Sequence, residues 1–107
     1  MVDPEIKNII LRFVKAIKVT GIRIERVVLY GSYASGRAHS ESDLDIAVVS
    51  PDFGKDRFEE GVKLNRIAWR IDPKIEAIPV SSRSYENDTW LPMIDEIKSK
   101  GIEIETT

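Results

Sequence analysis

The chain has 107 residues, no cysteine, and a net charge of −2 at pH 7. This length suits one compact domain, so we expect a single domain over residues 1–107. The lack of cysteine excludes disulfide frameworks, thiolate zinc sites and thiol nucleophiles, and the small excess of acids argues against stable binding to a nucleic acid backbone. The first twenty residues carry charges throughout, and no window has about 18 consecutive apolar residues. We therefore expect neither a signal peptide nor a membrane span, and a cytoplasmic location.

Hydrophobic periodicity and turn residues predict alternating helices and strands. Asp3-Pro4 is a favourable helix start, Asp72-Pro73 is a helix stop, and Gly101 is a helix cap. In chain order we expect a helix over 4–19, a strand over 27–30, a loop with room for one helical turn over 32–42, a strand over 43–49, a helix over 57–71, a strand over 74–80, a loop over 81–88, a helix over 92–100 and an edge strand over 102–104. This order indicates an α/β or α+β fold.

Gly31 and Ser32 stand between the first predicted strand and the possible helical turn. Glycine lets a ligand approach the backbone, and a serine hydroxyl together with free N–H groups at a helix start suits a phosphate. Alone, the pair is more typical of an ordinary strand-to-helix turn.

Asp43 and Asp45, which follow that turn, are candidate metal ligands. Residues i and i+2 of a strand lie on one face, about 6.5 to 7 Å apart along the chain, so these two carboxylates can bind a metal together. Like charges side by side raise each other's proton affinity, and a divalent cation relieves this repulsion. Magnesium suits such a site because it takes oxygen ligands and retains waters and substrate phosphates. A solvated pair of acids, or Asp43 as a helix cap, is the alternative.

Glu76 has the corresponding position in the third predicted strand, near its start and followed on the same face by apolar residues. A solvated glutamate is the alternative, and Asp72 competes for the role, although Pro73 favours Asp72 as a turn residue. Three acids and a phosphate-binding turn indicate phosphoryl or nucleotidyl transfer with two metal ions. The sequence has no Gly-Lys-Ser or Gly-Lys-Thr, so a Walker loop is excluded.

The segments Leu29-Tyr30-Gly31-Ser32-Tyr33-Ala34-Ser35-Gly36-Arg37 and Ser42-Asp43-Leu44-Asp45-Ile46-Ala47 together resemble the signature of the minimal nucleotidyltransferases. These enzymes belong to the DNA polymerase beta superfamily. The family pattern is an apolar residue, Gly-Ser, a short spacer and Asp-apolar-Asp, and the spacer here has ten residues, Tyr33 to Ser42. The resemblance implies a polymerase beta palm-like fold, with a small mixed sheet and helices packed on one face.

The resemblance also implies a site. Gly31 and Ser32 would contact the triphosphate, with Arg37 as a further phosphate contact. Asp43, Asp45 and Glu76 would be the catalytic carboxylates and would bind two Mg²⁺ ions. Many family members have Asp in place of Glu76.

Minimal members of the family are commonly paired with a small helical HEPN toxin, so the resemblance implies a protein acceptor. The chain would transfer AMP from ATP to a tyrosine of that toxin and so act as an antitoxin. The alternative is a non-catalytic antitoxin that neutralises its partner by binding. The nucleotide, the acceptor and any homo-oligomer through the strand near Ile102 are left open by the sequence.

Four other residues carry less specific expectations. Trp69 and Trp90 are expected to pack, with Trp90 alternatively part of a partner surface. Arg66 and Arg70, one helical turn apart, are expected to form a solvated face.

Overall fold

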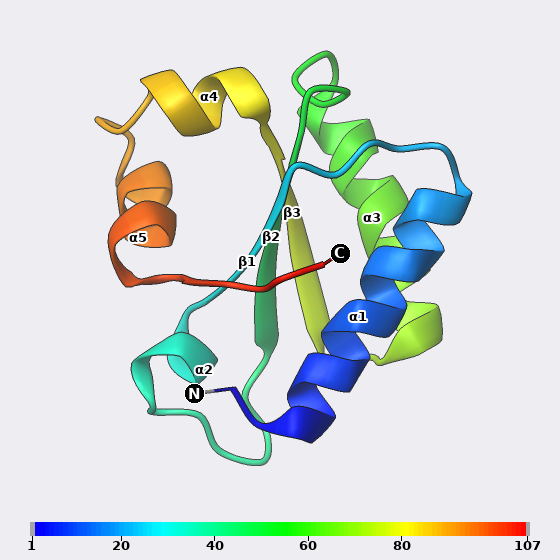
Figure 1. The fold of residues 1–107 in the computed structure, drawn as a ribbon, viewed down its shortest axis with the longest axis vertical. Coiled ribbons are helices and arrows are strands. Elements are labelled where there is room, and N and C mark those ends of the chain that lie inside the picture. Colours follow the sequence, from blue (N-terminus) through cyan, green and yellow to red (C-terminus); the bar gives the residue numbers. More distant parts are fainter. Residues whose placement is uncertain (1, 107) are drawn as a thin grey trace.

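A computed structural model describes residues 2–106 of the chain. The elements in chain order are α1 (Pro4–Val19), β1 (Arg26–Tyr30), α2 (Ser32–Ser35), β2 (Leu44–Ser50), α3 (Arg57–Ile71), β3 (Ile75–Ser81), α4 (Ser82–Asn87), α5 (Pro92–Lys100) and β4 (Ile102–Glu103). The sheet order is β3-β2-β1-β4 (Figure 1). β1 pairs antiparallel with β2 and β4, whereas β2 and β3 are parallel. This mixed sheet confirms the predicted fold class.

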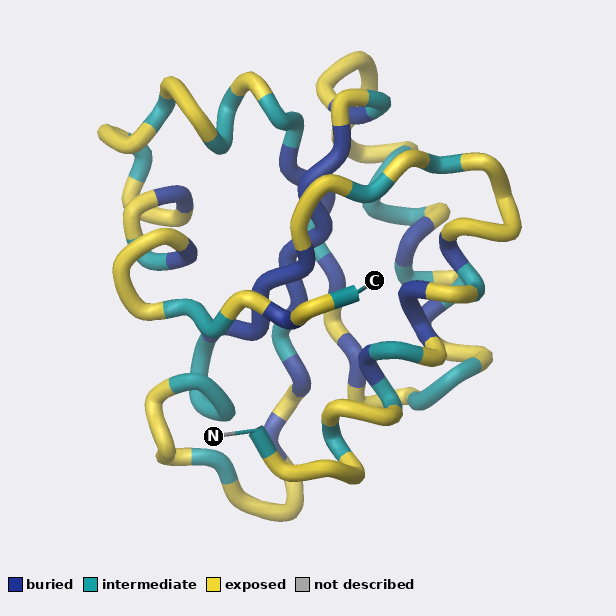
Figure 2. Tube along the Cα trace, in the orientation of Figure 1, coloured by how far each residue is buried: buried dark blue, intermediate teal, exposed yellow. Residues whose placement is uncertain are grey.

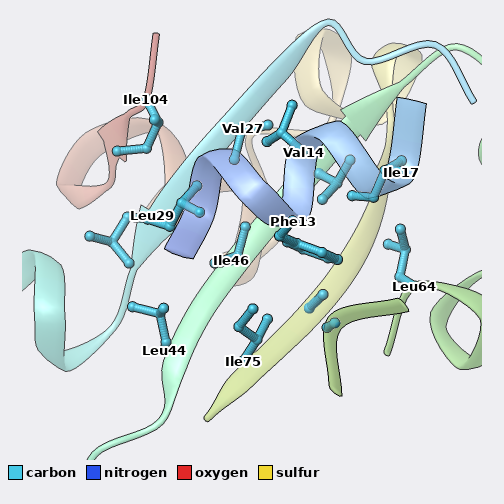
Figure 3. Close-up of a cluster of buried hydrophobic side chains, with 14 of the residues drawn as sticks. Phe13, Val14, Ile17, Val27, Leu29, Leu44, Ile46, Leu64, Ile75 and Ile104 are labelled. Carbon is cyan, nitrogen blue, oxygen red and sulfur yellow. The ribbon is translucent and has the colours of Figure 1, made fainter. Parts of the chain in front are cut away.

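The two long helices, α1 and α3, lie together on one face of the sheet (Figure 1). Phe13 and Ile17 of α1 and Leu64 of α3 are fully buried against the apolar side chains that β1, β2 and β3 present to this face (Figure 3). Asp3 caps α1, because its Oδ1 accepts a hydrogen bond of 2.8 Å from the Glu5 N–H. Hydrophobic burial on this face is the main stabilising term of the fold.

The opposite face of the sheet is also covered, whereas the resemblance implied helices packed on one face. Val28, Ala47 and Val49 pack there against Ile94 and Ile97 of α5, and α4 lies beside α5 (Figure 1). Both faces of β1 and β2 are therefore buried, and Figure 2 shows the deepest burial along these central strands. No helix within residues 2–106 combines the length and hydrophobicity needed to cross a bilayer.

Two local predictions were wrong. The segment expected to be a loop forms α4, where the hydroxyl of Ser81 accepts a hydrogen bond of 3.1 Å from the Ser84 N–H at the helix start. A cap of this kind stabilises a polar helix that has no apolar periodicity to reveal it. Trp69 and Trp90 do not pack in the core, since they are 60% and 75% exposed.

The outer edge of β3 is closed by a side chain of α3. The Asn65 amide donates to the Ala77 carbonyl at 2.8 Å and to the Gly61 carbonyl at 2.8 Å, while Asn65 Oδ1 accepts from the Ala77 N–H at 2.9 Å. The next residue with outward-facing backbone groups is Pro79, which has no N–H to offer. Natural sheets use such features to prevent edge-to-edge pairing.

We expect Asn65→Ala to lower the free energy of unfolding by about 1 to 3 kcal/mol, because both backbone groups of Ala77 would lose their partner. Urea denaturation measures the change. Asn8→Ala is the matched control. Asn8 is a solvent-exposed residue in the middle of α1, where replacing Asn by Ala gives the same gain in helix propensity without loss of a contact to the sheet. Equal stabilities of the two variants would contradict this role of Asn65.

Candidate active site

The sheet register places Asp45 between residues of both neighbouring strands. Asp45 is the Cα partner of Tyr30 on β1 and of Glu76 on β3. Such partners point to the same face, with neighbouring strands about 5 Å apart. Asp43 comes just before β2 and not within it, where the sequence had predicted it, but its charge acts on Asp45 together with that of Glu76. The three predicted carboxylates therefore belong to the end of the sheet where β1 leads into α2. This face is the one that α5 covers further along the strands.

Gly31 lies directly against the Asp45 carboxylate. Its φ of 72° and ψ of −149° are in a region that only glycine adopts readily. A Cβ atom built on Gly31 would overlap Asp45 Oδ2. The glycine therefore serves two purposes, because it makes the turn into α2 and leaves room for the carboxylate.

Burial and like charges together set the electrostatics of this cluster. Burial raises the pKa of Asp45 above its ordinary value, and the negative charges of Glu76, Asp43 and Glu96 raise it further. Burial also raises the pKa of Tyr30, with smaller contributions from Asp45, Glu76 and Glu96. No cation contributes to either shift, so the cluster would gain from a bound positive charge.

Ser32 is the first residue of α2, and Gly31 is its N-cap. The Gly31 carbonyl accepts hydrogen bonds of 3.1 Å from the N–H groups of Ala34 and Ser35. The N–H groups of Ser32 and Tyr33 have no acceptor within the helix, because the first N–H groups of a helix never do. These donors lie next to the carboxylates and are suited to an anionic group.

Arg37 does not join the carboxylates. It is exposed in the chain beyond α2, where its Nε donates to Ser35 Oγ at 3.2 Å.

Asp72 is occupied as a turn residue. Its Oδ1 accepts from the Lys74 N–H at 2.8 Å, and its carbonyl accepts from the Ile75 N–H at 3.2 Å. Glu76, and not Asp72, is the register partner of Asp45. The geometry therefore favours Glu76 of the two candidates.

Two residues at this site were missed by the sequence analysis. Tyr30 is buried beside Asp45 in register, and Glu96 comes from α5 and is half-buried. Tyr30 could have been found by counting back from Gly31 along the strand. Glu96 gives no such signal, because only the packing of α5 brings its charge near the strands.

Comparison with known proteins assigns the family. A model of the nucleotidyltransferase domain matches residues 6–100. The chain belongs to this family. A Methanocaldococcus jannaschii protein with the name "putative protein adenylyltransferase" is 32% identical over 101 residues, which are 94% of this chain and 99% of that protein. The chain is thus an enzyme of the nucleotidyltransferase class, as the two motifs predicted.

Three solved structures are similar to this chain in fold. A "putative nucleotidyltransferase" from Sulfolobus solfataricus gives a TM-score of 0.67 at 17% identity, covering 92% of this chain and 78% of that one. A toxin-antitoxin structure with AMP-PNP gives a TM-score of 0.58 at 26% identity, covering 94% of this chain and 73% of that one. A variant of the toxin-antitoxin MntA-HpeT gives 0.53 at 26% identity, covering 88% and 69%.

The residues of the site fit magnesium, although they do not form a closed cage. Within residues 2–106, no group of three or more His, Cys, Asp or Glu side chains is placed to hold a metal ion, so Asp43, Asp45 and Glu76 do not form a three-ligand site by themselves. Magnesium is usually bound by one or two carboxylates together with waters and substrate phosphates. The oxygen-only donors and the mutual repulsion around Asp45 suit a metal that is completed by the phosphates of a nucleotide.

Proposed function

We propose that this nucleotidyltransferase transfers AMP from ATP to a hydroxyl group of a protein, and that residues 1–107 act as one minimal catalytic domain. The observation that carries the proposal is the in-register pair of Asp45 and Glu76 beside the Gly31 turn. The name of the M. jannaschii relative and the AMP-PNP in a toxin-antitoxin neighbour support this choice of nucleotide and acceptor.

The site residues have the following proposed roles. Gly31 and Ser32 hold the triphosphate through the open backbone at the start of α2, and Arg37 adds a charge contact. Asp43 and Asp45 would hold two Mg²⁺ ions, and Glu76 would contribute a third carboxylate to the metals or accept the acceptor's proton. When bound, magnesium supplies charge neutralisation and activation of the attacking oxygen.

The proposed reaction is an in-line displacement at the α-phosphorus of ATP. A bond forms between the acceptor oxygen and the α-phosphorus, and the bond from that phosphorus to the β-phosphate oxygen breaks. Pyrophosphate leaves with the electron pair. The hydroxyl proton passes to Glu76 in this scheme, because Glu76 is exposed at the rim where an acceptor can approach.

We further propose that the acceptor is a tyrosine of a HEPN-type toxin in the cytoplasm, with this chain as the antitoxin. The toxin-antitoxin neighbours support a toxin partner. A tyrosine carries its hydroxyl at the far end of its side chain, which suits approach to the exposed carboxylate of Glu76.

Transfer of label from ATP labelled at its α-phosphate tests the function. With magnesium and the product of the adjacent gene, we expect the wild type to label that protein and Asp43→Asn to lose this labelling. The non-catalytic alternative is tested by the protection of cells from the toxin. If binding alone neutralises the toxin, an Asp43→Asn/Asp45→Asn double variant protects cells as well as the wild type does.

A further inference from the structure

The outer edge of β3 is surrounded by exposed apolar side chains. Phe58, Trp69 and Met93 are 76%, 60% and 44% exposed, and they are three of the five large hydrophobic residues exposed in the described chain. Phe58 and Trp69 come from α3 on one side of the sheet, whereas Met93 comes from α5 on the other. We call this region the β3-edge surface, made of Phe58, Val62, Trp69, Ile78, Pro79 and Met93.

The β3-edge surface is hollowed and continuous with the candidate active site. A groove of about 900 Å³ runs between α3 and β3, and a hollow of about 180 Å³ lies between β3 and α5. Both are lined by Ile78 and Pro79. The larger groove ends at Asp43 and Glu76, so a molecule bound along it would reach the catalytic carboxylates.

A partner cannot bind here by adding a strand to β3. Asn65 occupies the outward N–H and carbonyl of Ala77, and Pro79 lacks an N–H. The partner must therefore bind through its side chains. A groove beside a helix, lined by aromatic and aliphatic groups, is typical of a surface that receives an amphipathic helix.

The charges of the groove indicate the chemistry of the partner. Apart from the catalytic carboxylates, its charged lining residues are Arg57 and Arg66, and neither forms an ion pair within residues 2–106. Arginine at the border of an apolar contact favours acidic residues on the other side. A second copy bound through the same surface would bring arginines from both chains together, which disfavours a symmetric dimer.

We propose that the β3-edge surface docks the acceptor protein, through an amphipathic helix with acidic residues flanking its apolar face. The docked protein would contact Phe58 and Trp69 with its apolar side chains and Arg57 and Arg66 with its acids. Its accepting hydroxyl would then lie at the Glu76 end of the groove. This inference rests on the proposed function, because it names how the protein acceptor of that same site is held.

Binding of the adjacent gene's product, measured by isothermal titration without nucleotide, tests the proposal. We expect Trp69→Asp to raise Kd at least about tenfold, because exposed tryptophan in such a groove is the usual energetic centre of an interface. Arg66→Glu should raise Kd by a smaller factor that shrinks at high salt. Both residues are exposed, so neither change opens the core.

The matched controls are Val19→Asp and Lys63→Glu, which place the same new charges at exposed positions outside the β3-edge surface. They should bind as the wild type does. Equal Kd values for Trp69→Asp and Val19→Asp would overturn the docking site, as would a wild type that does not bind this protein or that binds itself instead.

Failure of docking and failure of catalysis are separable. Asp45→Asn should retain the wild-type Kd and lose label transfer if both proposals hold. Loss of binding in Trp69→Asp together with no label transfer by the wild type would leave the docking site standing and overturn the proposed function.

Discussion

Asp45→Asn is expected to reduce nucleotide transfer about a thousandfold or more and, at the same time, to raise the midpoint of thermal unfolding. The loss follows from the proposed metal role, since a cation that stabilises the transition state contributes several kcal/mol and each 1.36 kcal/mol is about tenfold in rate. The stability gain follows from the raised pKa of Asp45, caused by burial and by Glu76, Asp43 and Glu96. Label transfer and thermal unfolding measured without metal check the two effects.

The pH dependence follows from the same shift. Because the pKa of Asp45 is higher in the folded chain than its ordinary value of 3.8, the folded chain binds more protons between these two values. Its stability therefore falls as pH rises through this interval, and the advantage of Asp45→Asn should grow with pH and then level off above the folded pKa. An advantage that is constant with pH would contradict the repulsion around Asp45.

Asp52→Asn is the matched control. Asp52 is another aspartate, but the hydrogen bonds from Arg23, with an ion pair of 2.7 Å, lower its pKa. Neutralising Asp52 removes a favourable contact, so this variant should not gain stability and should transfer at the wild-type rate. A similar stability gain in both variants would indicate a general effect of reducing negative charge.

The elements with strong local signals could be predicted from the sequence. The spacing of Leu64, Ile67, Ala68 and Ile71, followed by Asp72-Pro73, predicted α3 over the residues where it is found. The strands also lie within one residue of their expected limits. Runs of β-branched residues bounded by Gly and Pro favour strands over helices, so their limits are easy to predict. The two-residue period of a strand predicted which face Asp45 and Glu76 occupy on their own strands, whereas their pairing depends on the register between β2 and β3.

What the sequence could not show depends on contacts between distant segments. The second helical layer forms because Ile94 and Ile97 of α5 pack against Val28 on the face of the sheet opposite to α1 and α3. The sequence of α5 alone does not show which face of the sheet it will cover. The same packing brings Glu96 toward Asp45. The exposure of Trp69 could not be predicted either, because a tryptophan on a helix can equally face a core or a partner.

Gly31→Ala is the second prediction with a large expected effect, and it tests the contact between the turn and the carboxylate. A methyl group at this position would overlap Asp45 Oδ2, so the carboxylate must move. A misplacement of about 1 Å in a catalytic group can cost about a hundredfold in rate. We expect transfer to fall by at least about this factor, with a lower free energy of unfolding from both the overlap and the backbone strain.

Gly36→Ala is the matched control for the strain. Gly36 also has a positive φ, 76°, but a Cβ atom there meets nothing within 4 Å. This variant should lose about 1 to 2 kcal/mol for the left-handed backbone and should leave the active site intact. Comparable losses of stability and activity in the two variants would show that the turn, and not the Asp45 contact, requires glycine.

A double-mutant cycle separates the overlap from the strain even if Gly31→Ala folds poorly. In an Asp45→Ala background the carboxylate is gone, so the added methyl has no oxygen to displace. Gly31→Ala should then cost less stability than in the wild type, by an amount that measures the contact. An unchanged loss of stability would mean that the backbone conformation of Gly31, with its ψ of −149°, fully explains why glycine is needed here. The Asp45 carboxylate would then move aside at no cost in free energy.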